Sequence, residues 1–511
     1  MNGAESLLRT AAGAGVEVCF ANPGTTEMPL VAAFDAVPEV RAVLGIFEGV
    51  CTGAADGYGR LTGRPALTLL HLGPGFANGI ANLHNARRAR TPVVNLIGDQ
   101  ASWHLDHDAP LTSDIASLAR PVSRWVHQSQ SARDLASDLA EAIGRSTAPP
   151  GGVSSLILPA DFQAEGAAGP VVVEAPASRT AVPDARIADL ASRLREARQA
   201  MILLGGAALD ERSQNAAGRI MAASSAHVLC ETFPACWERG SGLPGVSRLP
   251  YFPEQAREVL APCDLVILAD AREPVAFFGY AGQASRLAPD QSCHVLAGGH
   301  EEVSAALEAL ADALDAPSPP AISHALPDPA SGALDPLAIG VTLARCLPEG
   351  AIVVDEAATS GLPFYACSLG SPRHTLLALT GGAIGQGLPC AVGAAIARPD
   401  RKVVAFQADG SALYTAQALW TCARESLDVV ALLCSNRSYR ILQIELARAG
   451  IAEPGRQARS LTSLEEPAID WVSLARGYGV PGERVETAEE LAKALPRALA
   501  EPGPQLLELV L

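Results

Sequence analysis

The sequence predicts an α/β protein with three doubly wound parallel-sheet domains. Short apolar runs alternate with longer amphipathic stretches along almost the whole chain, which is typical of parallel sheets covered by helices. Two stretches rich in proline and small residues, 169–184 and 315–336, interrupt this alternation and are predicted to be linkers. The predicted domains are therefore residues 1–168, 185–314 and 337–511.

Apolar runs mark the expected strands of each domain. In the first domain these runs are 16–21, 40–47, 65–72, 91–98 and 151–160. In the second domain they are 199–206, 226–232, 263–270 and 292–299. In the third domain they are 351–357, 401–408, 427–434 and 504–511. Each run has the length of a buried strand, and residues at helical spacing lie between the runs.

Charge and composition exclude several classes of function. The 511 residues carry a formal net charge of -17 and have a pI of about 5.1, so neither a nucleic acid nor an anionic membrane surface is an expected partner. The 11 cysteines form no C-x-x-C pair, and the first residues do not resemble a secretory segment. No apolar run approaches the roughly 18 residues of a membrane helix. We expect a globular, cytoplasmic protein.

Polar residues end two neighbouring expected strands in QADGSALYTAQALWTCARESLDVVALLCSNRSY, residues 407–439. Asp409 follows the run 401–408, and Asn436 follows the run 427–434. A β-α-β unit makes its two strands parallel, so their carboxyl ends meet at one edge of the sheet. Gly410 and Ser411 lie at the expected helix start, where free amides favour an anion. Carboxylate and carboxamide oxygens beside a phosphate suit Mg²⁺.

Asp and Asn are also common turn residues, so either one alone has a simpler explanation. The joint pattern, with its separation of 27 positions, favours a site. It resembles the diphosphate-binding motif of thiamine diphosphate (ThDP) enzymes, in which G-D-G is followed by a helix, a strand and N; Ala408 replaces the first glycine. The resemblance implies that Mg²⁺ binds the side chains of Asp409 and Asn436 and the main-chain carbonyl of Ser438, with the diphosphate at 410–411.

A second motif lies near the other end of the chain. Glu48 stands between the expected strand 40–47 and a helix rich in small residues, where it could serve only the helix dipole. The stretch AADGYGR, residues 54–60, resembles the A-x-G-Y-A-R segment that follows a glutamate in ThDP enzymes of the pyruvate oxidase and decarboxylase group. The resemblance implies that Glu48 hydrogen-bonds the pyrimidine ring nitrogen and promotes the imino form of the cofactor.

A third motif is LTGGAIGQGLPCAVGAAIARPDRKV, residues 379–403. It resembles the G-G-x-G-x-x-L-P segment of the same enzymes, although a Gly-rich loop entering a helix would explain it in isolation. The resemblance makes Ile384 the apolar wedge between the two cofactor rings. It also makes the Gly382 carbonyl the acceptor for the pyrimidine amino group.

The resemblance covers the whole chain. It implies a pyrimidine-binding domain (1–168), a central domain (185–314) and a diphosphate-binding domain (337–511). FANPGTTEMPL and TPVVNLIGD look like the first domain of acetolactate synthases and benzoylformate decarboxylases. In this family the two ends of the cofactor are held by different subunits. Glu48 and Asp409 are therefore expected to meet across the interface of a homodimer or homotetramer.

The implied reaction is ThDP- and Mg²⁺-dependent decarboxylation of a small 2-oxo acid, with carboligation of the resulting carbanion or enamine to a second carbonyl compound, as in acetolactate synthases. One alternative is a non-oxidative decarboxylase of the benzoylformate decarboxylase type, which releases an aldehyde. A second alternative is a catalytically silent ThDP-binding protein, which the presence of Glu48 disfavours.

Residues around the expected pocket give mixed indications of the reaction. His71 stands where benzoylformate decarboxylases have a histidine, whereas the G-P-G after it is the synthase form. Thr25 stands where the decarboxylase has a serine, and 275–282 lacks its second histidine. His71 and Thr25 are therefore expected catalytic residues beside Glu48.

A polar loop and a second cofactor are further candidates for parts of the site. His104, Asp106 and His107 lie in a polar loop after the fourth expected strand and could face the substrate, although histidines in such loops are more often solvated. FAD is an unlikely cofactor, because the central stretch MILLGGAAL, residues 201–209, contains no G-x-G-x-x-G.

Overall fold

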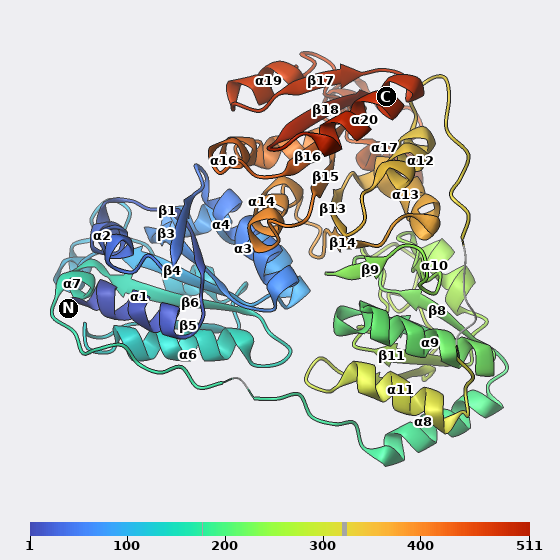
Figure 1. Cartoon of the computed structure of the whole chain (residues 1–511), viewed down its shortest axis with the longest axis horizontal. Coiled ribbons are helices and arrows are strands. Elements are labelled where there is room, and N and C mark those ends of the chain that lie inside the picture. Colours follow the sequence, from blue (N-terminus) through green and yellow to red (C-terminus); the bar gives the residue numbers. More distant parts are fainter. Residues whose placement is uncertain (176, 319–323) are drawn as a thin grey trace.

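Three separate β-sheets, each packed with helices, form the framework of the molecule (Figure 1). The computed structural model describes residues 1–175, 177–318 and 324–511. In Figure 1 the first lobe is blue and teal, the central lobe is green and yellow, and the third lobe is orange and red. All strand pairs but one in these sheets are parallel. The predicted α/β fold with three parallel sheets is confirmed.

The first sheet has six strands in the order β2-β1-β3-β4-β6-β5. Its strands are β1 (Val18–Asn22), β2 (Arg41–Leu44), β3 (Ala66–His71), β4 (Val93–Asp99), β5 (Trp125–Gln128) and β6 (Val153–Pro159). Its helices are α1 (Gly3–Gly13), α2 (Met28–Ala36), α3 (Glu48–Thr62), α4 (Leu72–Ala89), α5 (Ile115–Ala119), α6 (Leu135–Thr147) and α7 (Ala160–Ala164). The central strands β4 and β6 are buried along their whole length, as expected for a sheet with helices on both faces.

The central sheet has five strands in the order β10-β8-β7-β11-β12. Its strands are β7 (Ala200–Leu204), β8 (Ala226–Cys230), β10 (Ser247–Arg248), β11 (Leu265–Ala269) and β12 (Cys293–Ala297). Its helices are α8 (Asp184–Glu196), α9 (Glu211–Ala223), α10 (Pro253–Leu260) and α11 (Val303–Ala313). The chain reverses its direction of strand addition between β7 and β11, which makes their carboxyl ends the switch point of this sheet.

The third sheet has seven strands in the order β17-β18-β16-β15-β13-β14-β9. Its strands are β13 (Ala351–Glu356), β14 (His374–Ala378), β15 (Val403–Ala408), β16 (Val429–Ser435), β17 (Gly482–Val485), β18 (Gln505–Val510) and β9 (Trp237–Arg239). Its helices are α12 (Pro336–Cys346), α13 (Leu362–Cys367), α14 (Gly387–Ala397), α15 (Asp409–Ala412), α16 (Ala418–Arg424), α17 (Arg440–Arg448), α18 (Arg456–Ser460), α19 (Trp471–Gly477) and α20 (Ala488–Ala500). Strand β9 comes from the central segment and pairs antiparallel with β14.

Glycines let the first and third lobes pack helix against helix. A Cβ at Gly57 of α3 would lie 2.1 Å from the carbonyl oxygen of Cys390 in α14. A Cβ at Gly393 of α14 would lie 1.8 Å from the carbonyl oxygen of Ala54 in α3. Both distances are far below van der Waals contact, so only glycine fits at either position. The close approach brings the helix that begins at Glu48 against the helix that follows the Gly-rich loop.

Long connections join the lobes. On either side of residue 176, the described residues between the first lobe and α8, at the edge of the central lobe, run in an extended path (Figure 1). The predicted linkers 169–184 and 315–336 include residues 176 and 319–323, which lie outside the described residues. The domain limits given above stay a prediction. Among the described residues, no helix is long and apolar enough to cross a membrane.

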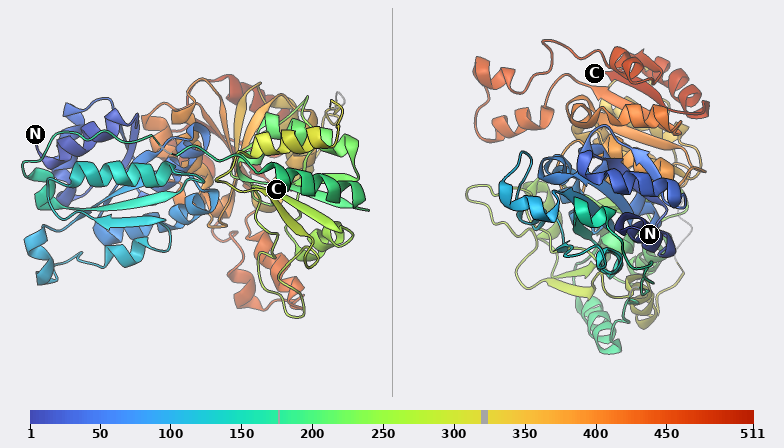
Figure 2. Two further views of the ribbon diagram at one scale, coloured as in Figure 1. Left: turned by 90° about the horizontal axis from the view of Figure 1, so that it is seen from below. Right: turned by 90° about the vertical axis from the view of Figure 1, so that its left-hand side faces the viewer.

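Helices α17 and α18 project from the third lobe (Figure 2). Helix α17 nevertheless contacts the central lobe: Tyr280 Oη donates to Glu445 at 3.2 Å, and Arg448 donates to Glu254 at 2.9 Å. The guanidinium of Arg448 also lies over the ring of Phe252, 4.8 Å from its centroid. The projecting segment is therefore tied to two lobes.

Candidate active site

The carboxyl ends of β15 and β16 bring Asp409 and Asn436 together. Asp409 directly follows β15, and Asn436 directly follows β16. The two strands are parallel, with Ala408 opposite Cys434, so both ends lie at one edge of the sheet. The backbone N–H of Arg437 donates to Asp409 Oδ2 at 2.6 Å, so this carboxylate lies against the residue after Asn436.

The Asp409 carboxylate has the surroundings of a cation ligand. The residue is only 1% exposed, and its hydrogen-bond partners are the backbone N–H groups of Gly410 and Arg437 rather than a cationic side chain. Burial raises the pKa of Asp409. A divalent cation at this carboxylate would offset the cost of burying its charge. The chemistry of this donor fits Mg²⁺.

Asn436 and Ser438 form a tight turn beside Asp409. The backbone N–H and the Oγ of Ser438 donate to Asn436 Oδ1 at 3.0 and 3.4 Å. Within the described part of the chain, no group of three or more His, Cys, Asp and Glu side chains could hold a metal ion. A site here would therefore depend on amide and main-chain oxygens in addition to the Asp409 carboxylate.

Gly410 and Ser411 lie in the single turn of the short helix α15, which follows β15 directly. A Cβ at Gly410 would lie 2.5 Å from the ring of Tyr439, so the turn has no room for a side chain there. Ser411 Oγ donates to the carbonyl of Ala408 at 3.0 Å. The predicted diphosphate position is thus the short helix α15, at the same sheet edge as Asp409.

The Gly-rich loop 380–386 connects β14 to α14. Gly382 and Gly385 have φ values of 78° and 92°, which glycine adopts without strain. Gly382 is exposed, and Ile384 is half-buried. A Cβ at Gly382 would lie 2.7 Å from the ring of Phe277, which comes from the central lobe. Ile384, the predicted wedge, and the Gly382 carbonyl, the predicted acceptor, therefore lie in one loop whose conformation requires glycine.

A buried glutamate that the sequence analysis did not single out holds the end of this loop. Glu356 Oε1 accepts the backbone N–H groups of Gly385 at 2.7 Å and Gln386 at 3.2 Å, and Oε2 accepts that of Gly387 at 2.7 Å. Burial raises the pKa of Glu356 to about 7. Its sequence signal is a carboxylate at the end of the apolar run AIVVDE, the same signal that pointed to Glu48.

Glu48 and His71 lie on either side of Gly75 in the first lobe. Glu48 opens α3, and His71 ends β3. A Cβ at Gly75 would lie 3.0 Å from Glu48 Oε1 and 3.3 Å from His71 Cβ, so this glycine allows both side chains to approach α4. Asn78 Nδ2 donates to Glu48 Oε2 at 3.0 Å, a contact that the sequence analysis did not anticipate. The carboxylate is thereby fixed in orientation.

A second buried glutamate, Glu27, contacts His71 and was not predicted from the sequence. Glu27 is fully buried, and its Oε2 lies 2.9 Å from His71 Nδ1 and accepts the backbone N–H of Gly24 at 2.6 Å. Thr26 Oγ1 donates to Glu27 Oε1 at 2.5 Å and lies 3.3 Å from His71 Nδ1. Thr25, the predicted catalytic threonine, is exposed. The signal for Glu27 was again a carboxylate shortly after an apolar run.

Comparison with known proteins agrees with this arrangement. Residues 1–118 match the family described as "Thiamine pyrophosphate enzyme, N-terminal TPP binding domain", and residues 361–509 match its C-terminal TPP binding domain. The whole chain is 48% identical to the "Putative acetolactate synthase large subunit IlvX" of Mycobacterium tuberculosis, 99% of which is covered. The chain belongs to the thiamine pyrophosphate enzymes. The family predicted from the three motifs is confirmed, since thiamine pyrophosphate is another name for ThDP.

Further relatives place the chain within the thiamine pyrophosphate enzymes. It is 30% identical to "Benzoylformate decarboxylase" of Pseudomonas aeruginosa over 97% of the chain and 96% of that protein. The solved structure of "Rhodococcus jostii RHA1 thiamine diphosphate-dependent 4-hydroxybenzoylformate decarboxylase" superposes with a TM-score of 0.86 at 26% identity, covering 99% of this chain and 98% of that one. The chain is a ThDP-dependent enzyme of the acetolactate synthase and benzoylformate decarboxylase family.

Proposed function

We propose that this enzyme catalyses the ThDP- and Mg²⁺-dependent decarboxylation of a 2-oxo acid. The observation that carries the proposal is the buried carboxylate of Asp409, which accepts two backbone N–H groups and, among the described residues, no cationic side chain, beside Asn436 at the carboxyl edge of the third sheet. When bound, ThDP supplies the nucleophilic carbon and the electron sink that the loss of CO₂ requires.

The remaining residues are proposed to have the roles that the resemblance to ThDP enzymes implies. Asp409, Asn436 and the Ser438 carbonyl would hold Mg²⁺, and the turn 410–411 would lie beside the diphosphate. The Gly382 carbonyl and the Ile384 side chain would hold and bend the two rings. Glu48 is the proposed partner of the pyrimidine nitrogen, and its bond from Asn78 would keep the carboxylate aimed at it.

The contact between Glu27 and His71 favours release of an aldehyde as the outcome. With Nδ1 bound to the buried carboxylate of Glu27, the Nε2 atom of His71 is left to give or take a proton in the site. A proton donor there supports a non-oxidative decarboxylase. Carboligation to a second carbonyl compound is the second candidate, which is supported by the relative named as an acetolactate synthase.

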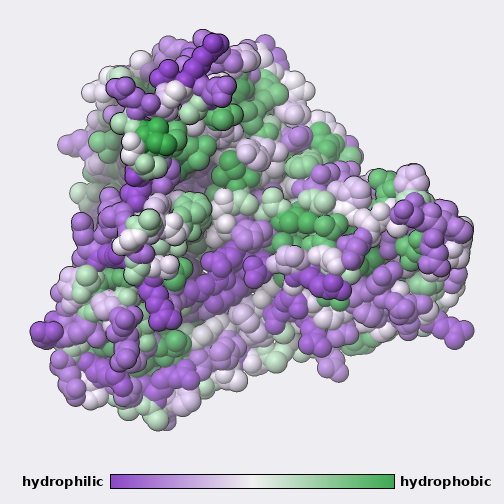
Figure 3. Space-filling model, turned by 180° about the vertical axis from the view of Figure 1, so that it is seen from behind, coloured by the Kyte–Doolittle hydropathy of each residue, from purple (hydrophilic) through white to green (hydrophobic). Residues whose placement is uncertain are grey.

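The enzyme is proposed to act as a homodimer or homotetramer, in which Glu48 of one subunit serves the cofactor held by Asp409 of another. Large apolar side chains are exposed on the single chain, including Met28, Ile46 and Tyr414. Apolar patches are visible between hydrophilic regions on the face seen in Figure 3. Burial of such surface between subunits would favour association.

Two carboxylates in the central lobe disfavour the binding of FAD there. The amides that follow β7 lie at the switch point of the sheet, where a nucleotide phosphate would bind in a fold of this type. Gly206 N–H donates to Glu231 at 3.1 Å, and Ala207 N–H donates to Asp270 at 2.9 Å. These carboxylates occupy the donors and would repel a phosphate, so we propose that the reaction proceeds without FAD.

Release of CO₂ from pyruvate and from benzoylformate, with and without ThDP and Mg²⁺, tests the proposed reaction. Cofactor-dependent release is expected, and the products then separate an aldehyde from acetolactate. No release from any of a panel of 2-oxo acids by enzyme that retains ThDP would contradict the proposal and favour a catalytically silent ThDP-binding protein.

His71→Ala is expected to lower the rate of aldehyde formation roughly 10²–10⁴-fold, the usual contribution of a positioned acid or base. Binding of ThDP should be unchanged, because His71 is not among the residues proposed to hold the cofactor. The rate and the ThDP affinity are measured together. His107→Ala is the matched control, since His107 is exposed in the same lobe. Equal rates for the two variants would remove His71 from catalysis.

A further inference from the structure

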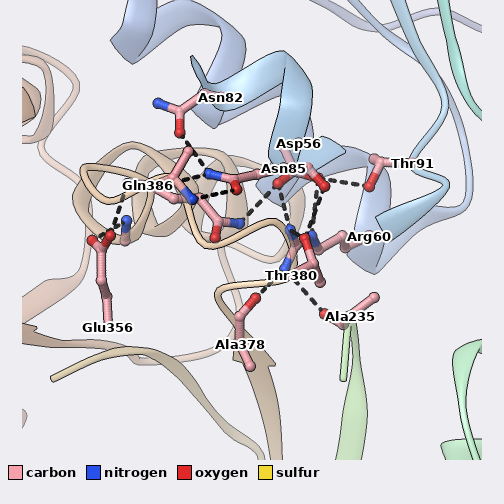
Figure 4. A network of polar contacts seen from close by, with 12 residues as sticks. Asp56, Arg60, Asn82, Asn85, Thr91, Ala235, Glu356, Ala378, Thr380 and Gln386 are labelled. Carbon is pink, nitrogen blue, oxygen red and sulfur yellow. Dashed lines mark hydrogen bonds and ion pairs between the residues drawn. The ribbon is translucent and has the colours of Figure 1, made fainter. Parts of the chain in front are cut away.

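A buried ion pair on α3 joins all three lobes (Figure 4). Arg60 and Asp56 lie one helical turn apart, and their side chains are 1% and 0% exposed. Arg60 Nε donates to Asp56 Oδ1 at 2.9 Å, and Nη2 donates to Oδ2 at 2.6 Å. Removing two charges from water costs a desolvation free energy that offsets much of their electrostatic attraction. A buried ion pair is therefore weak evidence of a purely stabilising role. The other hydrogen bonds of Arg60 and Asp56 indicate a role in holding the Gly-rich loop.

The remaining donors of Arg60 hold the start of the Gly-rich loop. Nη1 donates to the carbonyl of Ala378 at 2.7 Å and to that of Ala235, in the central lobe, at 3.3 Å. Nη2 donates to Thr380 Oγ1 at 3.0 Å. The guanidinium thus reaches the end of β14 and the first residue of the loop, as Figure 4 shows.

The Asp56 carboxylate holds the other end of the same loop. Gln386 Nε2 donates to Asp56 Oδ2 at 2.8 Å, and Thr91 Oγ1 donates to Oδ1 at 2.6 Å. Gln386 is 2% exposed, so this bond is shielded from water. The Asp56–Arg60 ion pair therefore forms hydrogen bonds at both ends of loop 380–386, which carries Gly382 and Ile384.

Two asparagines of α4 hold the middle of the loop. Asn85 Nδ2 donates to the carbonyl of Ala383 at 2.7 Å, and Asn85 Oδ1 accepts the N–H of the same residue at 3.2 Å. Asn82 Nδ2 donates to the carbonyl of Gly385 at 3.2 Å. The loop has no regular secondary structure, so side chains of the first lobe set much of its shape.

We propose that Asp56, Arg60 and Gln386 are positioning residues that hold loop 380–386 in the shape that receives the ThDP rings. The inference rests on the proposed function, because that function places the rings at Gly382 and Ile384. The inference divides the binding of ThDP into two parts. The Asp56–Arg60 ion pair holds the loop that receives the rings, whereas the sheet edge that carries Asp409 binds the diphosphate.

Gln386→Met tests this separation. Methionine has about the same length and keeps the volume, but it cannot donate to Asp56. We expect the affinity for ThDP with Mg²⁺ to fall about tenfold or more, the usual effect of losing a hydrogen bond to a charged group. The affinity for inorganic pyrophosphate with Mg²⁺, which lacks the rings, should stay unchanged. Both affinities are measured by titration calorimetry on the full chain.

Arg60→Met is the second variant, and Arg64→Met is its matched control. Arg64 lies just beyond the end of the same helix but forms an exposed pair with Glu17 in its own lobe. The control should bind both ligands as the unaltered protein does, whereas Arg60→Met should lose affinity for ThDP only.

Three results would count against the inference or its basis. Unchanged ThDP affinity in Gln386→Met would overturn it. An equal fall for ThDP and pyrophosphate would also overturn it, because that pattern indicates general damage to the third lobe. Failure of the unaltered protein to bind ThDP would instead remove the proposed function and the inference that rests on it.

Discussion

Asp409→Ala is expected to abolish the Mg²⁺-dependent retention of ThDP. Alanine removes the only carboxylate among the proposed metal ligands, and even changes outside the first ligand shell typically weaken metal binding 10–100-fold, so the loss should exceed about 100-fold. The variant is loaded with ThDP and Mg²⁺ and passed through a gel-filtration column. The cofactor that remains with the protein is then measured.

Asp400→Ala is the control for this loss. Asp400 lies in the same lobe, its side chain is 62% exposed, and it forms an ion pair with Arg398. It should retain ThDP as fully as the unaltered protein does. Retention of ThDP by Asp409→Ala would remove the metal site from the third sheet edge.

Glu48→Gln is expected to keep ThDP bound but to slow turnover roughly 10²–10⁴-fold. Glutamine has the shape of glutamate and can still accept the bond from Asn78, so the fold of the site should persist. It cannot share a proton with the pyrimidine nitrogen as a carboxyl group can. The variant is tested by the rate of proton exchange at the thiazolium carbon of the bound cofactor and by CO₂ release.

Glu39→Gln provides the comparison for Glu48→Gln. Glu39 is an exposed glutamate in the same lobe, and its substitution should leave both rates unchanged. If exchange at the thiazolium carbon proceeds equally fast in the two variants, Glu48 does not activate the cofactor.

Much of the fold could be predicted from the sequence because buried parallel strands are short apolar runs. The run 401–408 is such a case, since β15 occupies its last six residues. Strands at the sheet edges lack this signal. β9 has three residues, comes from the central segment and pairs antiparallel with β14, so no local pattern could assign it to the third sheet.

The candidate site was predictable where polar residues end strands in a known spacing. Asp409 and Asn436 are predicted in this way, and the structure brings them to one edge, while their role as metal ligands stays a prediction. Glu356 ends β13 and carries the same signal, whereas Glu27 lies in the short helix Thr25–Glu27 that follows β1. Both were missed because their partners are distant in the sequence. Glu27 meets His71 from 44 positions away, and no spacing rule links the two residues.

The most direct test of the shared site is to combine two inactive variants. Co-expressed, differently tagged Glu48→Gln and Asp409→Ala chains form a heterodimer that can be purified through both tags. If Glu48 acts on the cofactor held by the other subunit, one of the two sites is intact, and thiazolium proton exchange should recover to about half the unaltered rate per dimer. A heterodimer no faster than the two parent homodimers would contradict the account and place the whole site within one chain.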